Sequence, residues 1–181
     1  KDYREGENLM SVERVTTWIN QFNEEDRQFV LEEMKHILKQ RYISKERAHG
    51  LVDEMIEFLT DHFKCTNPKE FLLSSYFIDH QPEGKSQKEL LHFLADILIE
   101  KYGINIKDCS LEKAKFYVYF DDVLCTGDTL FKGLAVNNNG NIGWFHWTND
   151  DGRTNLDLIK QNNGKLVLAY FAIHDYNIKK T

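Results

Sequence analysis

The chain has 181 residues, of which 41% are hydrophobic and 13% aromatic, and its formal net charge is −6. This composition predicts a globular protein, and the negative charge does not indicate a nucleic-acid partner. No apolar run approaches the ~20 residues of a membrane span. The N-terminus lacks the apolar core of a signal peptide, and the three cysteines show no metal-ligand spacing. We therefore expect a cytoplasmic protein that does not enter a membrane.

The first third of the chain predicts three amphipathic helices between residues 11 and 63. Ser11, Asn23 and Ser44 stand at favoured N-cap positions, ahead of apolar side chains spaced three and four residues apart. These residues carry no pattern typical of chemistry, so we expect them to pack or to bind a protein partner. We assign residues 1–66 to an N-terminal helical subdomain. The second helix is expected to place one apolar stripe in the core, made of Phe29, Val30, Met34, Ile37 and Leu38.

From residue 67 onward the pattern becomes α/β, because apolar strands alternate with helices. Asn67-Pro68 is expected to break the preceding helix. Residues 67–181 are expected to form a parallel sheet with flanking helices. Since the chain ends soon after a strand, truncation of this domain at its C-terminus stays open. The expected strands are 71–78, 104–106, 116–120, 142–147 and 165–173, and the expected helices begin near 86, 130 and 154, the first ending at Gly103.

The stretch from Phe116 to Leu130 combines a strand, an acid pair and a polar turn. Asp121 and Asp122 follow the strand, and Thr-Gly-Asp-Thr at 126–129 precedes a helix. Carboxylates accept hydrogen bonds from sugar hydroxyls, and such a turn offers hydroxyls and backbone N–H groups to a phosphate. The combination favours a site for a phosphorylated sugar over an α/β loop that is polar without a function.

A second polar loop, residues 79–86, follows the preceding predicted strand. Ligands of parallel sheets bind beyond the carboxyl ends of the strands, so we expect this loop and the acid pair to face one crevice. Gly84 permits close backbone approach, and Lys85 and Ser86 supply a cation and a hydroxyl suited to pyrophosphate. His80, in the same loop, is expected to be structural or solvated.

Two other phosphate-binding patterns are disfavoured. A P-loop nucleotidase requires Gly where this chain has Asp79, and Pro82 lies inside the loop. A haloacid-dehalogenase phosphotransferase requires an Asp-x-Asp pair, whereas the two aspartates here are adjacent. We disfavour the P-loop less strongly.

Residues Phe116 to Thr129 resemble the phosphoribosyl-pyrophosphate (PRPP) motif of type I phosphoribosyltransferases. The resemblance lies in a hydrophobic strand, two adjacent acids, two hydrophobic residues, a small residue and Thr-Gly-x-Thr. The loop at 83–86 resembles the pyrophosphate loop of that family. The helical region, with Trp-Ile-Asn-Gln-Phe at 18–22 and Tyr-Ile-Ser at 42–44, is similar to phosphoribosyltransferase-like proteins of bacterial conflict systems, including retron-type anti-phage loci.

The resemblance implies a role for each motif residue. Asp121, Asp122 and Lys85 would be the catalytic residues, with both aspartates at the ribose hydroxyls. Mg²⁺ would be held mainly by oxygens of the ligand, and only indirectly by the two aspartates. The remaining ligand-binding positions would be Gly84 and Ser86 at the pyrophosphate and Cys125, Thr126, Gly127, Asp128 and Thr129 at the 5′-phosphate.

The resemblance implies a protein that binds PRPP or a nucleotide and transfers or removes a phosphoribosyl or base group, as a glycosyltransferase-class enzyme in anti-phage defence. Cys125 stands where purine-salvage members often carry an Asp that meets the base, which disfavours hypoxanthine/guanine salvage. Two alternatives stay open. One is a catalytically inactive nucleotide-sensing module that binds a protein partner through its N-terminal helices, and the other is a P-loop-like nucleotidase.

Overall fold

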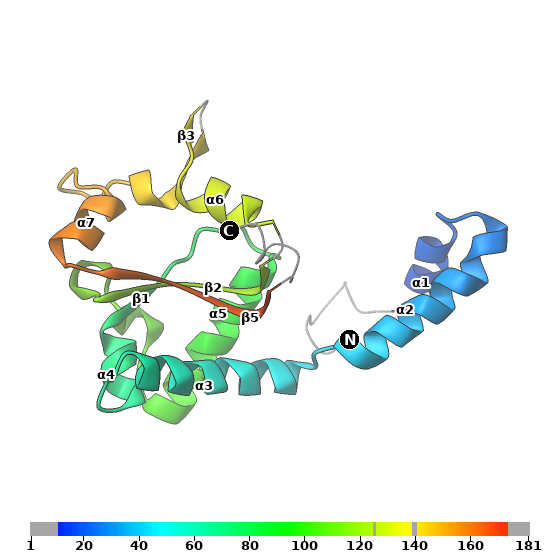
Figure 1. Ribbon diagram of the computed structural model, residues 1–181, viewed down its shortest axis with the longest axis horizontal. Coiled ribbons are helices and arrows are strands. Elements are labelled where there is room, and N and C mark those ends of the chain that lie inside the picture. The colour runs from blue at the N-terminus through cyan, green and yellow to red at the C-terminus, as the bar shows by residue number, and fades with distance from the viewer. Residues whose placement is uncertain (1–10, 125, 139–140, 174–181) are drawn as a thin grey trace. The chain divides into compact units, whose positions relative to one another are not determined.

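The computed structural model describes residues 11–124, 126–138 and 141–173. The chain divides into two compact units, residues 1–48 and 49–181, and each is described by itself (Figure 1). This division falls inside the third helix. The predicted division into a helical subdomain, residues 1–66, and an α/β domain, residues 67–181, stays a prediction.

The first unit contains α1 (Val12–Ile19), a 3₁₀ turn at Glu24–Asp26 and α2 (Arg27–Arg41). Ser11 caps α1, because its side chain accepts a hydrogen bond from the Arg14 N–H at 3.2 Å.

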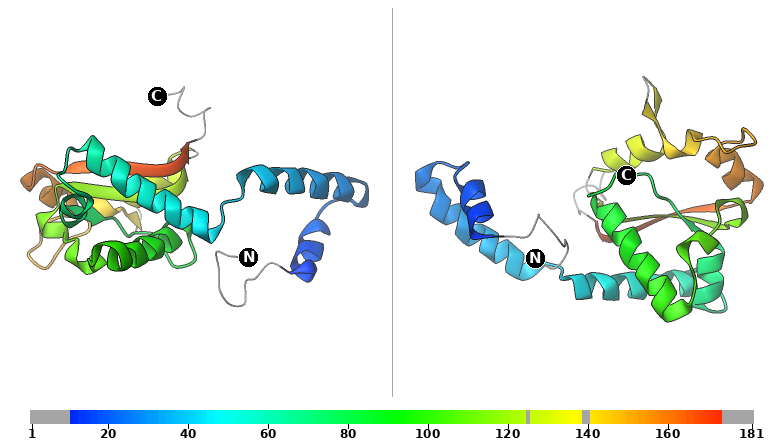
Figure 2. Two further views of the ribbon diagram at one scale, coloured as in Figure 1. Left: turned by 90° about the horizontal axis from the view of Figure 1, so that it is seen from below. Right: turned by 180° about the vertical axis from the view of Figure 1, so that it is seen from behind.

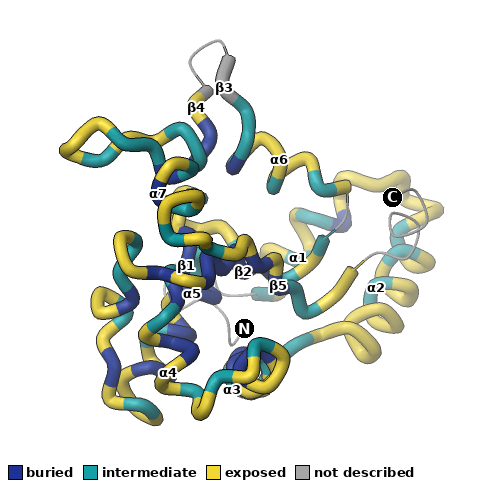
Figure 3. The backbone as a smooth tube through the Cα atoms, turned by 60° about the vertical axis from the view of Figure 1, so that its left-hand side comes forward, coloured by how far each residue is buried: buried dark blue, intermediate teal, exposed yellow. Residues whose placement is uncertain are grey.

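The apolar stripe predicted for the core on α2 is not buried. Phe29 is 65% exposed, and Ile37 and Leu38 are each about half exposed. Figure 3 shows α2 as mostly exposed, and no residue of this helix is buried. The prediction of a core stripe is therefore wrong for these three side chains.

The region around residue 70 differs from the sequence prediction. Asn67-Pro68 starts a helix, α4 (Pro68–Leu73), after α3 (Lys45–His62) has ended. The Asn67 side chain accepts a hydrogen bond from the Glu70 N–H at 3.0 Å, and proline is tolerated in a first helical turn because its missing N–H has no partner there. The strand predicted for 71–78 is therefore reduced to β1 (Ser75–Phe77).

Helix α5 (Ser86–Ile97) starts where the sequence predicts, and it continues as a π-helical segment, Leu98–Tyr102, to Gly103. Gly103 has φ 62°, the left-handed geometry expected of a C-cap glycine. No strand forms at 104–106, because the Asn105 side chain caps a 3₁₀ turn over Ile106–Asp108. A further 3₁₀ turn spans Leu111–Lys113 and leads into β2 (Phe116–Leu124).

In the second unit, β2 is followed by α6 (Asp128–Leu134). This helix begins two residues earlier than predicted. The segment predicted as a strand over 142–147 contains the end of a short hairpin and a 3₁₀ turn. The remaining elements are β3 (Asn137–Asn138), β4 (Asn141–Ile142), the 3₁₀ turn Trp144–His146, α7 (Asn155–Gln161) and β5 (Lys165–Ile173).

The sheet has three parallel strands in the order β1-β2-β5, which confirms the predicted α/β class. Strand β2 is central and pairs on both sides, with Tyr76 beside Tyr117 and Asp121 beside Tyr170. The pairing with β5 continues to Leu124. The acid pair therefore lies within β2, whereas the sequence placed it after the strand.

Both faces of β2 are covered. Figures 1 and 2 show α6 and α7 on one face of the sheet and α4 and α5 on the other. Tyr117 and Tyr119 pack on the first face, in a cluster with Leu134 and Trp144. On the second face the Phe116 ring stacks on Phe63 with ring centroids 4.4 Å apart. Burial on both faces explains the nearly continuous apolar sequence of this strand.

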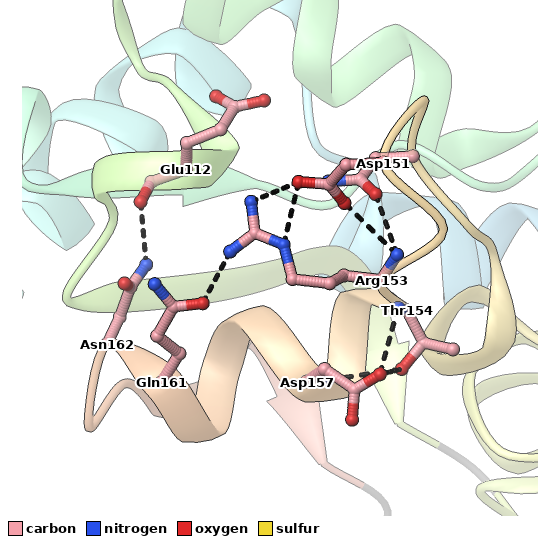
Figure 4. A network of polar contacts seen from close by, with 8 residues as sticks. Glu112, Asp151, Arg153, Thr154, Asp157, Gln161 and Asn162 are labelled. Atoms are coloured by element: carbon pink, nitrogen blue, oxygen red, sulfur yellow. Dashed lines mark hydrogen bonds and ion pairs between the residues drawn. The ribbon is translucent and has the colours of Figure 1, made fainter.

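Polar contacts cap the start of α7 and connect its C-terminal end to the sheet (Figure 4). Thr154 and Asp157 form a capping box at its first turn. Arg153 binds both Asp151 and Gln161. At the C-terminal end, the Asn162 amide donates to the backbone oxygen of Glu112 and to the Tyr117 hydroxyl, both at 2.9 Å. The turn into β5 is thereby fixed beside β2.

We expect Thr154→Ala to lower the free energy of unfolding by about 1 kcal/mol, because the first turn of α7 loses its cap. Urea denaturation followed by circular dichroism measures the change. Thr154→Ser retains the hydroxyl and is the matched control, expected to remain close to wild type. Equal losses in the two variants would contradict the capping role.

Candidate functional site

A cavity of about 1000 Å³ lies at the carboxyl end of the sheet. Its wall comes from the loop after β1, the end of β2, the turn into α6 and Tyr170 of β5. The structure thus brings the two polar loops together at one cavity. Among the residues predicted for the site, Lys85, Ser86, Asp121, Asp122, Thr126, Gly127, Asp128 and Thr129 line it.

The outcome is different for two predicted site residues, Gly84 and Cys125. Gly84 is not among the residues that line the cavity, but its φ of +79° gives the loop a conformation that favours glycine. Cys125 lies outside the described residues, so its predicted role at the 5′-phosphate stays a prediction.

The loop after β1 is folded back onto the start of α5. Gln87 is fully buried, and its side chain donates to the Ile78 oxygen and accepts from the Gln81 N–H, each at 3.2 Å. Lys88 pairs with Asp79 at 2.6 Å on the outer side. These contacts hold Gln81 and Ser86 toward the end of β2.

Asp121 is buried and accepts four hydrogen bonds. Its Oδ2 receives the Gln81 side-chain amide at 3.1 Å and the Tyr119 hydroxyl at 3.2 Å. Its Oδ1 receives the Ser86 hydroxyl and the Asp122 N–H, both at 2.9 Å. The Gln81 amide also donates to the Tyr119 hydroxyl at 2.9 Å. Loop, strand and helix therefore converge on one carboxylate.

Asp122 has a different environment. Its Oδ1 accepts the Val123 N–H at 2.7 Å and lies 3.2 Å from the Ser86 hydroxyl. Burial raises the pKa of Asp122 above its usual range, and the neighbouring Asp121 carboxylate adds to that effect. The hydrogen bonds from Val123 and Ser86 act in the opposite direction.

Two tyrosines, Tyr119 and Tyr170, stand beside Asp121 on the same face of the sheet. Burial and the Asp121 charge raise the pKa of Tyr170 to about 12 and raise that of Tyr119 as well. Both phenols therefore keep their protons at neutral pH, and Tyr119 remains a hydrogen-bond donor to Asp121.

The turn into α6 is opened by Gly127, which has φ 76° and occupies the N-cap position. The Thr126 hydroxyl accepts the Asp128 N–H at 3.3 Å. The Asp128 carboxylate pairs with Lys132 at 2.7 Å, one helical turn along. Thr126 and Thr129 are exposed to the cavity side, so the turn presents two hydroxyls there.

The far wall of the cavity is apolar. Trp147 donates its indole N–H to the Ile142 oxygen at 2.9 Å, which orients the ring. The sequence pattern singled out no ligand contact in this segment. The residues of this wall are Leu130, Phe131, Val136, Ile142 and Trp147.

Comparison with known proteins adds one match. The family model PRTase-CE matches residues 15–181. The chain belongs to this phosphoribosyltransferase-type family. Neither the curated proteins nor the solved structures gave a match.

The PRTase-CE match covers the helices before the sheet as well as the sheet itself. Within the described part of the chain, no helix is long and apolar enough to cross a membrane. The same residues hold no group of three or more His, Cys, Asp or Glu side chains that could bind a metal ion by themselves.

The sequence interpretation missed Gln81 and Tyr119, which hold Asp121 in this PRTase-CE site. Tyr119 could have been found, because residues two apart in a strand share a face and Tyr119 precedes Asp121 by two. Gln81 has no such signal, since its contact depends on how the loop folds back.

His80 connects the loop to α6. Its ring lies 5.3 Å from that of Tyr119, and a Cβ added at Gly133 would overlap it. Burial lowers the pKa of His80, with hydrogen bonding to Gln87 and the Asp121 charge acting in the opposite direction. The His80 ring packs on the backbone of α6 at Gly133.

We expect Gly133→Ala to lower the free energy of unfolding by about 1 to 3 kcal/mol through overpacking against His80. In a His80→Ala background the same substitution should cost much less. A double-mutant cycle by urea denaturation measures the coupling. Equal costs in both backgrounds would show that the two residues do not interact.

The raised pKa of Asp122 predicts a pH effect on stability. An ordinary Asp titrates near about pH 4, so between that pH and the higher folded pKa the native state binds more protons than the unfolded state. The free energy of unfolding contributed by Asp122 therefore falls as pH rises through this window. As pH rises through this window, the melting temperature of Asp122→Asn should fall less than that of wild type in thermal unfolding scans. Asp150→Asn removes an exposed carboxylate and should retain the wild-type slope.

Proposed function

We propose that the cavity binds PRPP or a nucleotide together with Mg²⁺ and that the protein transfers or removes a phosphoribosyl or base group. The observation that carries the proposal is that the acid pair and the Thr-Gly-Asp-Thr turn line one cavity in a member of a phosphoribosyltransferase-type family. The type I form of the fold is part of this proposal, supported by the PRPP motif within β2 and the turn after it.

The pentose would lie between the carboxylates and the turn. Carboxylate oxygens accept hydrogen bonds from sugar hydroxyls, and the Thr126 and Thr129 hydroxyls can donate to a phosphate. The turn residues around Gly127 add backbone N–H groups. This arrangement supports a ligand with a phosphate at one end and hydroxyls toward β2.

Lys85 lines the cavity at the start of α5, where it can contact a pyrophosphate group. When Mg²⁺ is bound through pyrophosphate oxygens, it neutralises charge on the leaving group. Asp121 and Asp122, which line the same cavity, would act on such an ion only indirectly, through the bound ligand.

The proposed reaction breaks the bond between C1′ and the pyrophosphate oxygen and forms a bond between C1′ and a nitrogen nucleophile. The electron pair of the broken bond leaves with pyrophosphate, positive charge develops at the ribose ring, and the nitrogen nucleophile releases its proton to solvent as the new bond forms. Protein groups would contribute mainly positioning and charge stabilisation, with Lys85 toward the leaving group and the carboxylates toward the sugar.

A second candidate is a sensor that binds the ligand without turnover and passes the signal to a protein partner. The exposed apolar side chains of α2, including Phe29, favour a partner surface. A role in anti-phage defence belongs to either candidate and is supported only by the resemblance of the helical region. The P-loop alternative is less favoured, because the family match supports a phosphoribosyltransferase-type protein.

Thermal-shift titration with PRPP and Mg²⁺ tests the proposed binding, because a ligand that binds only the native state raises the melting temperature. We expect Thr129→Val to lower the affinity for PRPP about tenfold, because a hydrogen bond to the phosphate is lost. Thr148→Val, whose side chain does not line the cavity, is the matched control. The absence of a melting-temperature shift in wild type would refute binding. Release of pyrophosphate from PRPP when bases are added would favour the enzyme, and binding without release would favour the sensor.

A further inference from the structure

The two acids of the site differ in how many of their acceptor positions the protein already uses. A carboxylate offers about four acceptor positions. Asp121 accepts from Gln81, Tyr119, Ser86 and the Asp122 N–H, which uses all of them. Only 8% of Asp121 is exposed. A ligand hydroxyl could reach this carboxylate only by displacing a hydrogen bond that is already made.

Asp122 accepts fewer hydrogen bonds from the described residues than Asp121 does. Its Oδ1 accepts the Val123 N–H and shares the single Ser86 proton with Asp121, with the shorter distance on the Asp121 side, 2.9 against 3.2 Å. Among the described residues none donates to Asp122 Oδ2. The residue lines the cavity and is more exposed than Asp121.

We propose that Asp122 alone contacts the sugar hydroxyls through Oδ2, whereas Asp121 is a positioning residue that Gln81 and Tyr119 hold in place. This inference rests on the proposed function for the identity of the ligand. It departs from the expectation that both aspartates contact the ribose, and it assigns roles to two residues outside the acid pair.

The hydrogen-bond balance supports this division. A hydroxyl that binds Asp122 Oδ2 satisfies an acceptor without breaking a protein contact. A hydroxyl that binds Asp121 must displace one of the four hydrogen bonds that this buried carboxylate already accepts, and an unmade buried hydrogen bond is costly. The carboxylate of Asp121 is thus a fixed anchor for the loop, the strand and the start of α5.

A hydroxyl-deletion cycle tests the contact. Calorimetric titrations of the full chain use ribose 5-phosphate, 2-deoxyribose 5-phosphate and 3-deoxyribose 5-phosphate as probes. Wild type should lose about tenfold or more in affinity on removal of the contacted hydroxyl, since that hydroxyl donates to a charged acceptor. Asp122→Asn should largely abolish this difference, whereas Asp121→Asn should retain it. Loss of the difference in Asp121→Asn alone would overturn the proposal.

The positioning role has its own readout. Tyr119→Phe and Asp121→Asn should weaken the binding of ribose 5-phosphate and leave the binding of inorganic phosphate unchanged. The reason is that both substitutions displace Asp122 without altering the phosphate turn. They should also keep the wild-type ratio between ribose and deoxyribose probes. A changed ratio in Tyr119→Phe, or equal weakening of inorganic phosphate, would contradict positioning.

A measurement without ligand separates this inference from the proposed function. If neither PRPP with Mg²⁺ nor a pentose 5-phosphate binds wild type, the proposed function fails, and thermal unfolding still tests the division of roles. Asp121→Asn should lower the melting temperature by several degrees, because an amide has one acceptor oxygen and cannot accept all four hydrogen bonds that reach the two oxygens of Asp121. Asp122→Asn should not lower it. The reverse order would overturn the inference.

Discussion

The arrangement of the second unit depends on the pairing of β2 with a parallel strand on each side. Because both edges of β2 are paired and both faces are covered, its side chains alternate between two buried layers. On one face the sequence runs from Tyr117 through Tyr119 to Asp121, from the core cluster into the cavity. The candidate site is therefore a continuation of the core, and its first carboxylate is held by the strand that organises the fold.

The polar network at the end of β2 makes the two loops parts of one site. Asp121 receives hydrogen bonds from the loop after β1, from the first residue of α5 and from its own strand. His80 rests on the backbone of α6 at Gly133, which connects the same loop to the helix after the phosphate turn. A change in the conformation of either loop would therefore alter the position of the carboxylates. Such coupling suits a site that must hold a phosphate and a sugar at once.

The errors of the sequence interpretation have local causes. The apolar run at 71–78 is compatible with either a helix or a strand, and the Asn67 cap with Pro68 decided for a helix up to Leu73. On α2 the apolar spacing did predict a helix, but spacing alone cannot say whether a second surface covers the stripe. The acid pair was placed after the strand, because only the pairing of Leu124 with Ile173 shows that β2 continues past it.

The sequence by itself determined the α/β class, the start of α5, the end of its π-helical extension at Gly103 and the resemblance to a phosphoribosyltransferase, since these follow from local periodicity, capping and a contiguous motif. It also predicted that the two polar loops face one crevice, since parallel strands end at one edge. Only the tertiary structure decided how the two acids differ. That difference depends on Gln81, which lies 40 residues before Asp121 and reaches it only because the buried Gln87 side chain holds the loop backbone. Contacts of this kind leave no periodic trace in a sequence.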